Sequence, residues 1–159
     1  MQDRTLAACY GFNMHYRFNS PLGPIAYDWN GRFCSGLSLG DEAAAADAGN
    51  DPVSRWLVVY FTGQAAPLPL LAPPATPFQL KMRAGLLAIP FGEVCTYGQL
   101  AARLGTAPRA LGQALGANPL PILIPCHRVL AVNGPGGFAS GLEWKERLIG
   151  FEHDFSTHP

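Results

Sequence analysis

Residues 96–119 read TYGQLAARLGTAPRALGQALGANP, and this stretch predicts two short helices joined by a tight turn. Thr96 and Gln99 have the spacing of a capping box, which marks the start of the first helix. Gly105 follows the last apolar residue of that helix, and glycine commonly ends helices. The second helix is expected over 109–116. Two helices in this arrangement are typical of a helix-turn-helix, which we therefore expect here.

The second helix of this pair carries mostly small side chains. Its single charged residue is Arg109, at its start. Because it lacks a set of long side chains for reading bases in the major groove, contact with DNA would fit the minor groove better. Tight packing against a neighbouring helix explains the same composition equally well. The small residues are Ala110, Gly112, Ala114 and Gly116.

The residues before this pair predict one more helix and a domain boundary. Thr76 and Gln79 repeat the capping-box spacing, and an apolar stripe follows at helical intervals. The proline-rich segment 64–77 can form neither a helix nor a central strand, so we interpret it as a stiff linker. The boundary divides residues 1–75 from residues 76–159. The stripe consists of Phe78, Met82, Leu86 and Ile89.

The first half of the chain predicts a small support domain. Residues 14–39 alternate between short apolar runs and turn residues, including Asn30-Gly31, and this pattern indicates a small antiparallel sheet. Residues 41–50 are expected to form a short helix, and a second helix is expected to begin at Pro52 and to stop at Gly63. The predicted fold class is α/β of the α+β kind, with this domain followed by a mainly helical one.

Composition and charge narrow the class of protein. The chain has 159 residues, of which 48% are apolar and 14% are charged, which excludes a disordered protein. The formal net charge is zero, which excludes a polycation. Residues 78–152 nevertheless hold seven Lys or Arg and four Asp or Glu, so an anionic partner is expected to meet this part of the chain.

The cysteines and the termini indicate the compartment. The four cysteines include no CxxC pair, so neither a thioredoxin motif nor a paired zinc knuckle is expected. They are too sparse for a disulfide framework, and free thiols are expected. The sequence shows neither a signal peptide nor an apolar run of the roughly 18 residues that a membrane helix needs. We therefore expect a soluble cytoplasmic protein with no membrane partner.

Residues 122–130 read ILIPCHRVL and place a cysteine among groups that could activate it. A thiolate is a strong nucleophile, and adjacent imidazole or cationic groups lower the pKa of a thiol. For Cys126 these neighbours are His127 and Arg128. A buried structural cysteine is the alternative interpretation. In an extended segment the side chains of Cys126 and His127 would point to opposite faces, so their cooperation needs a bend or a water molecule.

Residues 114–152 resemble the O6-alkylguanine-DNA alkyltransferases, also called methylated-DNA–protein-cysteine methyltransferases. The signature of this family is PCHRV, found here at 125–129, preceded by Asn118-Pro119. The resemblance covers residues 76–152 strongly and the first 75 residues only loosely, through SPLG at 20–23 and YFTG at 60–63. The other matching motifs are TPFQ at 76–79, IPFGEV at 89–94, TYGQLA at 96–101 and Gly136-Gly137-Phe138.

The resemblance implies a reaction and a set of reacting groups. The family moves an alkyl group from guanine O6 in duplex DNA to its own cysteine, once per molecule, after flipping the base out of the stack. By this match Cys126 is the acceptor, His127 the base acting through a water, and Glu152 the residue that orients the imidazole. Asn118 would brace the turn, and Tyr97 would donate a proton toward guanine N3.

The resemblance also implies how the substrate is held. Pro121 and Phe138 would line the alkyl pocket, although the family often has tyrosine at the position of Phe138. Backbone amides at Ala139 and Ser140 would contact O6, and Lys145 would hold this loop. Arg109 would fill the space left by the flipped base. The other residues expected to contact DNA are Thr96, Tyr97, Gln99, Ala110, Gly112, Gln113 and Ala114.

The resemblance implies no cofactor, and we expect a monomer. The zinc-binding members of the family use N-terminal cysteines and histidines, and Cys9, His15 and Cys34 do not match that pattern, so no metal is expected. We expect Arg128 to have a structural role, pairing within the domain.

Three other functions remain to be weighed. A related protein could bind the alkylated base without transfer, but such proteins replace the cysteine that is present here as Cys126. A cysteine hydrolase would turn over many substrates, and the arginine-led helix of small residues does not favour it. A transcription factor would need base-reading side chains on the second helix.

Overall fold

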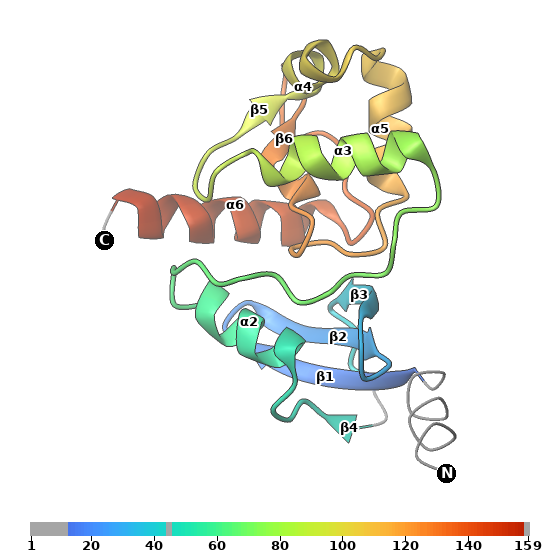
Figure 1. Ribbon diagram of the computed structural model, residues 1–159. Coiled ribbons are helices and arrows are strands. Elements are labelled where there is room, and N and C mark those ends of the chain that lie inside the picture. Colours follow the sequence, from blue (N-terminus) through green and yellow to red (C-terminus); the bar gives the residue numbers. More distant parts are fainter. Residues whose placement is uncertain (1–12, 44–45, 158–159) are drawn as a thin grey trace. The chain divides into compact units, whose positions relative to one another are not determined.

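The computed structural model describes residues 13–43 and 46–157, and the chain divides into two compact units between Pro73 and Pro74 (Figure 1). The first unit contains a small sheet and one helix, and the second contains four helices and a pair of very short strands among its described residues. The predicted α+β fold class is confirmed.

The sheet of the first unit has the strand order β3-β2-β1-β4. Strands β1 (Met14–Ser20), β2 (Gly23–Trp29) and β3 (Cys34–Leu39) are antiparallel neighbours, as the turn residues between them predict. Asn30 closes the second turn, because its side-chain oxygen accepts the N–H groups of Arg32 and Phe33 at 2.9 and 2.8 Å. The small antiparallel sheet predicted over residues 14–39 is thus confirmed.

The helix predicted over 41–50 is wrong for the described part of that segment. Ala46–Asp47 form the short strand β4, which pairs in parallel with Tyr16 and Arg17 of β1. The guanidinium of Arg17 also binds the Asp47 carboxylate at 2.7 Å. Alanine favours helix, but so short a helix is only marginally stable without a face to bury, and pairing with the sheet edge prevails.

Helix α2 (Pro52–Tyr60) begins where the sequence predicts. The Asp51 side chain caps it by accepting the N–H groups of Val53 and Ser54, both at 2.9 Å. The Tyr27 hydroxyl donates to the other oxygen of Asp51 at 2.5 Å and thereby ties the helix start to the sheet. The helix ends three residues before Gly63, which has a φ of +74° in the following turn.

As far as Thr76 the proline-rich segment contains neither a helix nor a regular strand, as predicted, but it is anchored to the sheet. The N–H of Cys34 donates to the carbonyl of Leu70 at 2.9 Å, and the N–H of Ala72 donates to the carbonyl of Cys34 at 2.8 Å. Residues 70–72 therefore pair with the start of β3 and do not act only as a connection.

The first two predicted helix starts of the second unit are confirmed. Helix α3 (Pro77–Leu87) is capped by Thr76, but the Gln79 side chain accepts from the N–H of Ala75, so the reciprocal half of that capping box is absent. Helix α4 (Tyr97–Leu104) has the complete box between Thr96 and Gln99. It ends at Gly105, whose φ is +65°.

The remaining elements of the second unit are α5 (Pro108–Gly116), α6 (Leu142–Thr157), the strands β5 (Cys95–Thr96) and β6 (Val129–Leu130), and a 3-10 turn at Cys126–Arg128. Helix α5 starts one residue before the predicted 109–116, with Pro108 in its first turn. Strands β5 and β6 pair in parallel. No helix in the described ranges combines the length and the apolar character required to cross a bilayer.

The core of the second unit is built from the inner faces of its helices and from one buried loop. Helices α4 and α5 contribute Leu100, Leu104, Leu111 and Leu115. A Cβ at Gly85 of α3 would come within 2.9 Å of Leu104, so α3 and α4 pack closely. The loop residues Leu120, Ile122, Leu123 and Ile124 are at most 1% exposed. Each of these side chains stabilises the fold by about 1.5–3 kcal/mol, and together they fix the segment that leads to Cys126.

Candidate active site

Cys126 lies at the end of this buried loop, in a backbone turn. Its side chain is only 7% exposed, and its N–H donates to the carbonyl of Ile124 at 2.7 Å. The Asn118 side chain braces the loop, because it donates to the Ile124 carbonyl and accepts the Leu120 N–H, both at 3.0 Å. Ile122 adopts a φ of +71°, an unfavourable value for a β-branched residue that this packing enforces. The bend that cooperation between Cys126 and His127 requires is therefore present.

His127 and Glu152 form a buried pair. His127 is 0% and Glu152 is 2% exposed, and Nε2 of the imidazole lies 2.5 Å from Oε2 of the carboxylate. Hydrogen bonds from His127 and Arg128 outweigh burial and lower the pKa of Glu152 to about 2, while burial lowers the pKa of His127. A neutral His127 must then donate from Nε2 to the ionised carboxylate. Its other nitrogen, Nδ1, is buried and accepts no hydrogen bond from the described residues.

Arg128 is paired inside the unit. Its Nε donates to Oε1 of Glu152 at 2.7 Å, and one terminal nitrogen donates to Oε2 at 3.2 Å. The other terminal nitrogen donates to the carbonyl of Ile89 at 2.7 Å. The Phe91 ring lies 5.8 Å from the guanidinium carbon. The sequence predicts pairing within the domain for Arg128, but it does not identify Glu152 as the partner.

Lys145 is the buried cation beside the thiol. Its ammonium donates to the carbonyls of Val129 and Gly137 at 2.7 and 3.0 Å, and burial lowers its pKa. Burial raises the pKa of Cys126, while a hydrogen bond from Asn118 and the charge of Lys145 act in the opposite direction. Cys126 is therefore a thiol that needs a base to become a nucleophile.

Tyr97 is brought toward Cys126 by the short parallel pair of strands. It directly follows β5, and Cys126 lies three positions before the start of β6. Burial and the nearby Cys126 raise the pKa of Tyr97. Its hydroxyl donates to the Gly137 carbonyl at 3.4 Å. Tyr97 therefore carries its proton at neutral pH, and its hydroxyl is available as a hydrogen-bond donor.

The loop after β6 contacts Tyr97 and Lys145 through two of its glycines. Gly137 accepts from both Tyr97 and Lys145, and Gly136, with a φ of +78°, packs against the tyrosine ring. Pro121 is buried in the preceding loop. The predicted substrate residues Phe138 and Ser140 are half-buried, and Ala139 is exposed. Their predicted contacts with O6 and with the alkyl group stay predictions.

Helix α5 presents one face to the core and another to solvent. Leu111 and Leu115 are buried, Gly112 and Ala114 are half-buried, and the exposed residues include Arg109, Ala110 and Gln113. Within the described residues Arg109 forms no ion pair. Thr96 and Gln99 are occupied by the capping box at the start of α4, so their use as DNA contacts also stays a prediction.

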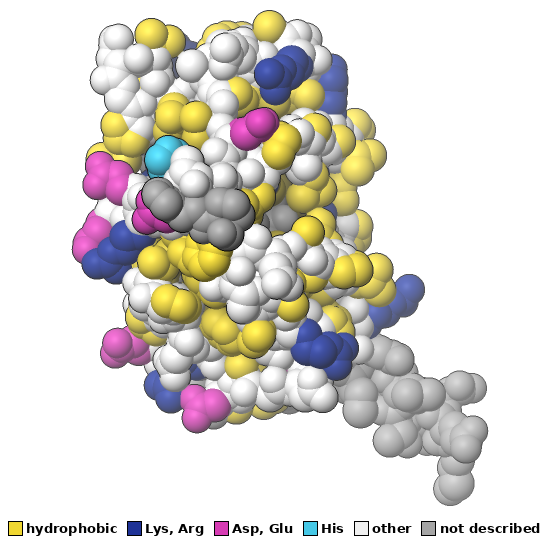
Figure 2. Space-filling model, turned by 90° about the vertical axis from the view of Figure 1, so that its left-hand side faces the viewer, with side chains coloured by type: hydrophobic (Ala, Val, Ile, Leu, Met, Phe, Trp, Pro, Cys, Tyr) yellow, Lys and Arg dark blue, Asp and Glu magenta, His cyan; other side chains and the backbone are white. Residues whose placement is uncertain are grey.

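Charge is dispersed on the face of the molecule drawn in Figure 2. Lys and Arg side chains occur there singly or in small groups between Asp, Glu and apolar side chains, without one large basic area. This distribution agrees with the zero net charge of the sequence. Any contact with DNA on this face would depend on few phosphates.

The residues weighed as metal ligands are engaged elsewhere or not described. The two ring nitrogens of His15 lie 2.7 Å from Asp28 and 3.4 Å from Asp41, and the Cys34 thiol donates to the carbonyl of Gly36. Cys9 lies outside the described residues. In the ranges 13–43 and 46–157, no cluster of three or more His, Cys, Asp or Glu could hold a metal ion.

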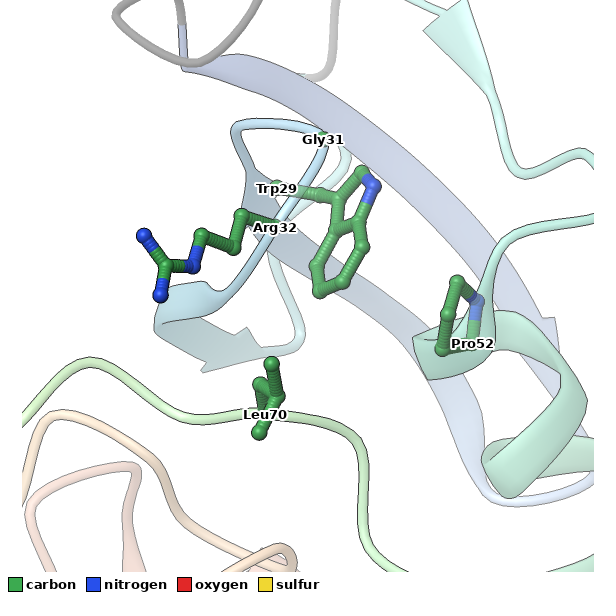
Figure 3. Close-up of a pocket in the computed structure, with 5 residues that line it drawn as sticks. All are labelled: Trp29, Gly31, Arg32, Pro52 and Leu70. Atoms are coloured by element: carbon green, nitrogen blue, oxygen red, sulfur yellow. The ribbon is translucent and has the colours of Figure 1, made fainter.

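A pocket in the first unit contains none of the predicted site residues (Figure 3). The Arg32 side chain extends away from the indole of Trp29. The chemistry that the sequence predicts is therefore concentrated in the second unit. The residues that line the pocket are Trp29, Gly31, Arg32, Pro52 and Leu70.

Comparisons with known proteins match the part of the chain that holds this site. The family model described as 6-O-methylguanine DNA methyltransferase, DNA binding domain, matches residues 77–154, which include every residue of the cluster around Cys126. The methylated-DNA–protein-cysteine methyltransferase of Saccharolobus solfataricus is 44% identical over 99 residues. That match covers 60% of this chain and 64% of the relative, so it spans less than two thirds of the relative's length.

Two further proteins are similar along most of the chain. The methylated-DNA–protein-cysteine methyltransferase of Methanosarcina acetivorans is 39% identical over 153 residues, covering 87% of this chain and 98% of the relative. The crystal structure of Mycobacterium tuberculosis OGT in complex with DNA has a TM-score of 0.76 and 29% identity, covering 89% of this chain and 93% of that one. The chain has a buried cysteine next to a histidine–glutamate pair, and it is similar to these proteins over most of its length. The protein therefore belongs to the methylated-DNA–protein-cysteine methyltransferase family.

Proposed function

We propose that this protein repairs DNA by moving the alkyl group of O6-alkylguanine to the sulfur of Cys126. The observation that carries the proposal is the buried His127–Glu152 pair. It occupies Nε2 of the imidazole and leaves Nδ1 as an acceptor, on the residue that directly follows Cys126. In the reaction the Cys126 sulfur forms a bond to the alkyl carbon as the bond from that carbon to guanine O6 breaks. Each chain reacts once, because the thioether that forms has no route back to the thiol.

The thiol proton needs an acceptor, because burial raises the pKa of Cys126. Nδ1 of His127 is that acceptor, directly or through a water molecule. The imidazolium that forms is stabilised by the ionised Glu152 at 2.5 Å. The three residues act as a catalytic triad in which cysteine is the nucleophile, histidine the base and glutamate the carboxylate that orients the histidine.

The guanine that leaves needs a proton, because it gains negative charge as its bond to the alkyl carbon breaks. Tyr97 supplies this proton toward N3, which completes the balance: one proton leaves the thiol and one reaches the base. A general acid of this kind contributes about 100- to 10,000-fold to a rate. The neighbouring Lys145 stabilises the tyrosinate that remains, since its ammonium lies 5.6 Å from the centre of the ring.

The DNA contact is proposed for the outer face of α5. Guanine O6 lies inside the base stack, so the base must be flipped out before the sulfur can reach it. The small side chains of Ala110 and Gly112 allow the helix to approach the minor groove, and Arg109 enters the space that the base vacates. A structural neighbour that was crystallised with DNA supports this partner.

The alkyl group is proposed to lie against Pro121 and Phe138, with the amides of Ala139 and Ser140 near O6. We also expect the protein to act as a monomer, because every residue of the proposed reaction comes from one unit of one chain.

The test is mass spectrometry after incubation with a duplex that contains one O6-methylguanine. We expect one added methyl per chain on the Cys126 peptide, saturating at one equivalent. The Cys126→Ala variant should bind this duplex and gain no mass. The Cys95→Ala variant is a matched control, because Cys95 is a second buried thiol of the same unit, and it should react like the wild type.

Three outcomes would contradict the proposal. Tight binding of the methylated duplex without added mass would indicate a protein that recognises the lesion without transfer. Added methyl on Cys95, or multiple turnovers that release a small product, would contradict the assignment of Cys126 as the final acceptor.

A further inference from the structure

Three nitrogens of Arg128 donate to three oxygen atoms, which belong to two residues. Two of them hold the two oxygens of Glu152 at 2.7 and 3.2 Å, and the third holds the Ile89 carbonyl at 2.7 Å. The side chains of Arg128 and Glu152 are 11% and 2% exposed, so little water competes for these bonds. A planar guanidinium with both ends bonded cannot rotate, and the carboxylate that it holds is fixed with it.

The aromatic residues around this pair restrict it further. Phe91 lies 5.8 Å from the guanidinium carbon, and its ring makes an edge contact with Phe151 at 6.3 Å between ring centres. Phe151 directly precedes Glu152 on α6. The arginine is therefore enclosed between the helix that carries its partner and the loop that follows α3.

The charges around His127 explain why the Arg128–Glu152 contact affects the protonation of the imidazole. Burial is the main cause of its lowered pKa, Glu152 opposes that effect, and the positive charges of Arg128 and Lys145 add to it. Cys126 adjoins it on the 3-10 turn, and Tyr97 faces Cys126 from the start of α4. Without Arg128, the carboxylate would stabilise a protonated imidazole, which has no free nitrogen for a second proton.

We propose that Arg128 is a positioning residue for alkyl transfer: it fixes the Glu152 carboxylate against Nε2 of His127 and thereby reserves Nδ1 for the proton of Cys126. The proposal rests on the proposed function for the reaction itself. The arrangement of the three side chains does not require DNA, so it can be tested separately.

The experiment compares three variants with the wild type. Arg128→Met keeps the length of the side chain and removes its charge, and Arg128→Lys keeps the charge and removes the two-point grip. Arg147→Met is the matched control, because Arg147 pairs with Glu143 on the exposed side of α6. The 15N chemical shifts of His127 are followed against pH without DNA, and single-turnover methyl transfer is followed against pH with the methylated duplex.

For wild type and Arg147→Met we expect a neutral His127 with its proton on Nε2 near pH 7. For Arg128→Met we expect a protonated or mixed-tautomer ring at that pH, and methyl transfer at least tenfold slower. Its transfer should recover in part as the pH rises. Arg128→Lys should be slower than wild type by a similar factor at every pH tested, with an unshifted profile.

A folded Arg128→Met protein with wild-type His127 shifts and a wild-type pH profile would overturn the proposal. If that variant does not fold, Arg128→Lys decides, because wild-type transfer by it would show that the grip is not needed. If the wild type itself transfers no methyl group, the proposed function fails, and the His127 shifts alone then test the positioning role.

Discussion

Replacing Gly136 by alanine is expected to impair transfer by moving Tyr97. An added Cβ would lie 2.8 Å from Cε2 and 2.9 Å from the hydroxyl oxygen of Tyr97, and 3.3 Å from the backbone nitrogen of Ala131. Carbon atoms need about 3.5–4.0 Å, so the ring must move by roughly 1 Å. A displacement of that size in a reacting group can slow a reaction by about 100-fold.

The same change has a cost in stability. Gly136 has a φ of +78°, and an L-residue in the left-handed region loses about 1–2 kcal/mol. The reduced freedom of the unfolded chain returns roughly 0.4–1 kcal/mol. Because the displaced ring adds strain, we expect the free energy of unfolding to fall by about 1–3 kcal/mol.

The assay is single-turnover methyl transfer with protein in excess over the methylated duplex, accompanied by thermal unfolding. Gly134→Ala is the matched control, because Gly134 lies in the same loop and a Cβ there has open space around it without a left-handed φ. We expect this control to transfer at the wild-type rate. If Gly136→Ala matches Gly134→Ala in both rate and melting temperature, the proposed role of the Tyr97 position is refuted.

Three further changes test other contacts. Glu152→Gln leaves the buried Arg128 without a charged partner, so the free energy of unfolding measured with denaturant should fall by about 3–5 kcal/mol, and an unchanged value would contradict the buried pair. Arg109→Ala should slow transfer from duplex DNA more than transfer from free O6-benzylguanine, and equal slowing of both would exclude the role proposed for it in base flipping. The hydrogen bond that the His15 ring donates to the Asp28 carboxylate raises the pKa of His15 above 6.5. The contribution of protonated His15 to the stability of the folded state is therefore complete at pH values below 6.5, and it is lost as the pH rises through the higher folded-state pKa. His15→Gln should flatten that part of the curve of unfolding free energy against pH, and a wild-type slope would contradict the assignment.

Much of the fold could be predicted because its signals are local. Capping residues and prolines mark the starts of α2, α3 and α4, and each signal acts within four residues of the chain. The helix predicted over 41–50 was wrong. The helix propensity of alanine is a weak signal in so short a segment, and the pairing with β1 depends on residues more than twenty positions away. The anchoring of Leu70 and Ala72 on Cys34 is equally non-local.

The site divides in the same way. Cys126 and its neighbours follow from one short motif, and family resemblance assigns Glu152 and Tyr97 their roles. The grip of Arg128 on Glu152 joins residues 24 positions apart, and the packing of Gly136 on Tyr97 joins residues 39 positions apart in the printed sequence. Neither follows from spacing, because the first depends on how α6 returns to the 3-10 turn and the second on how the loop after β6 returns to the start of α4.

The parallel pair of β5 and β6 has a consequence for how such a protein can change. Two residues on each side bring the segments of Tyr97 and Cys126 together. Between them the chain leaves to form α4 and α5, whose outer residues belong neither to this pair nor to the Arg128–Glu152 contact. Under the DNA contact proposed for α5, substitutions on that outward face alter which DNA is bound while the reacting groups keep their spacing. Recognition and reactivity can therefore be varied separately, by evolution or by an engineer who exchanges the outer face of α5.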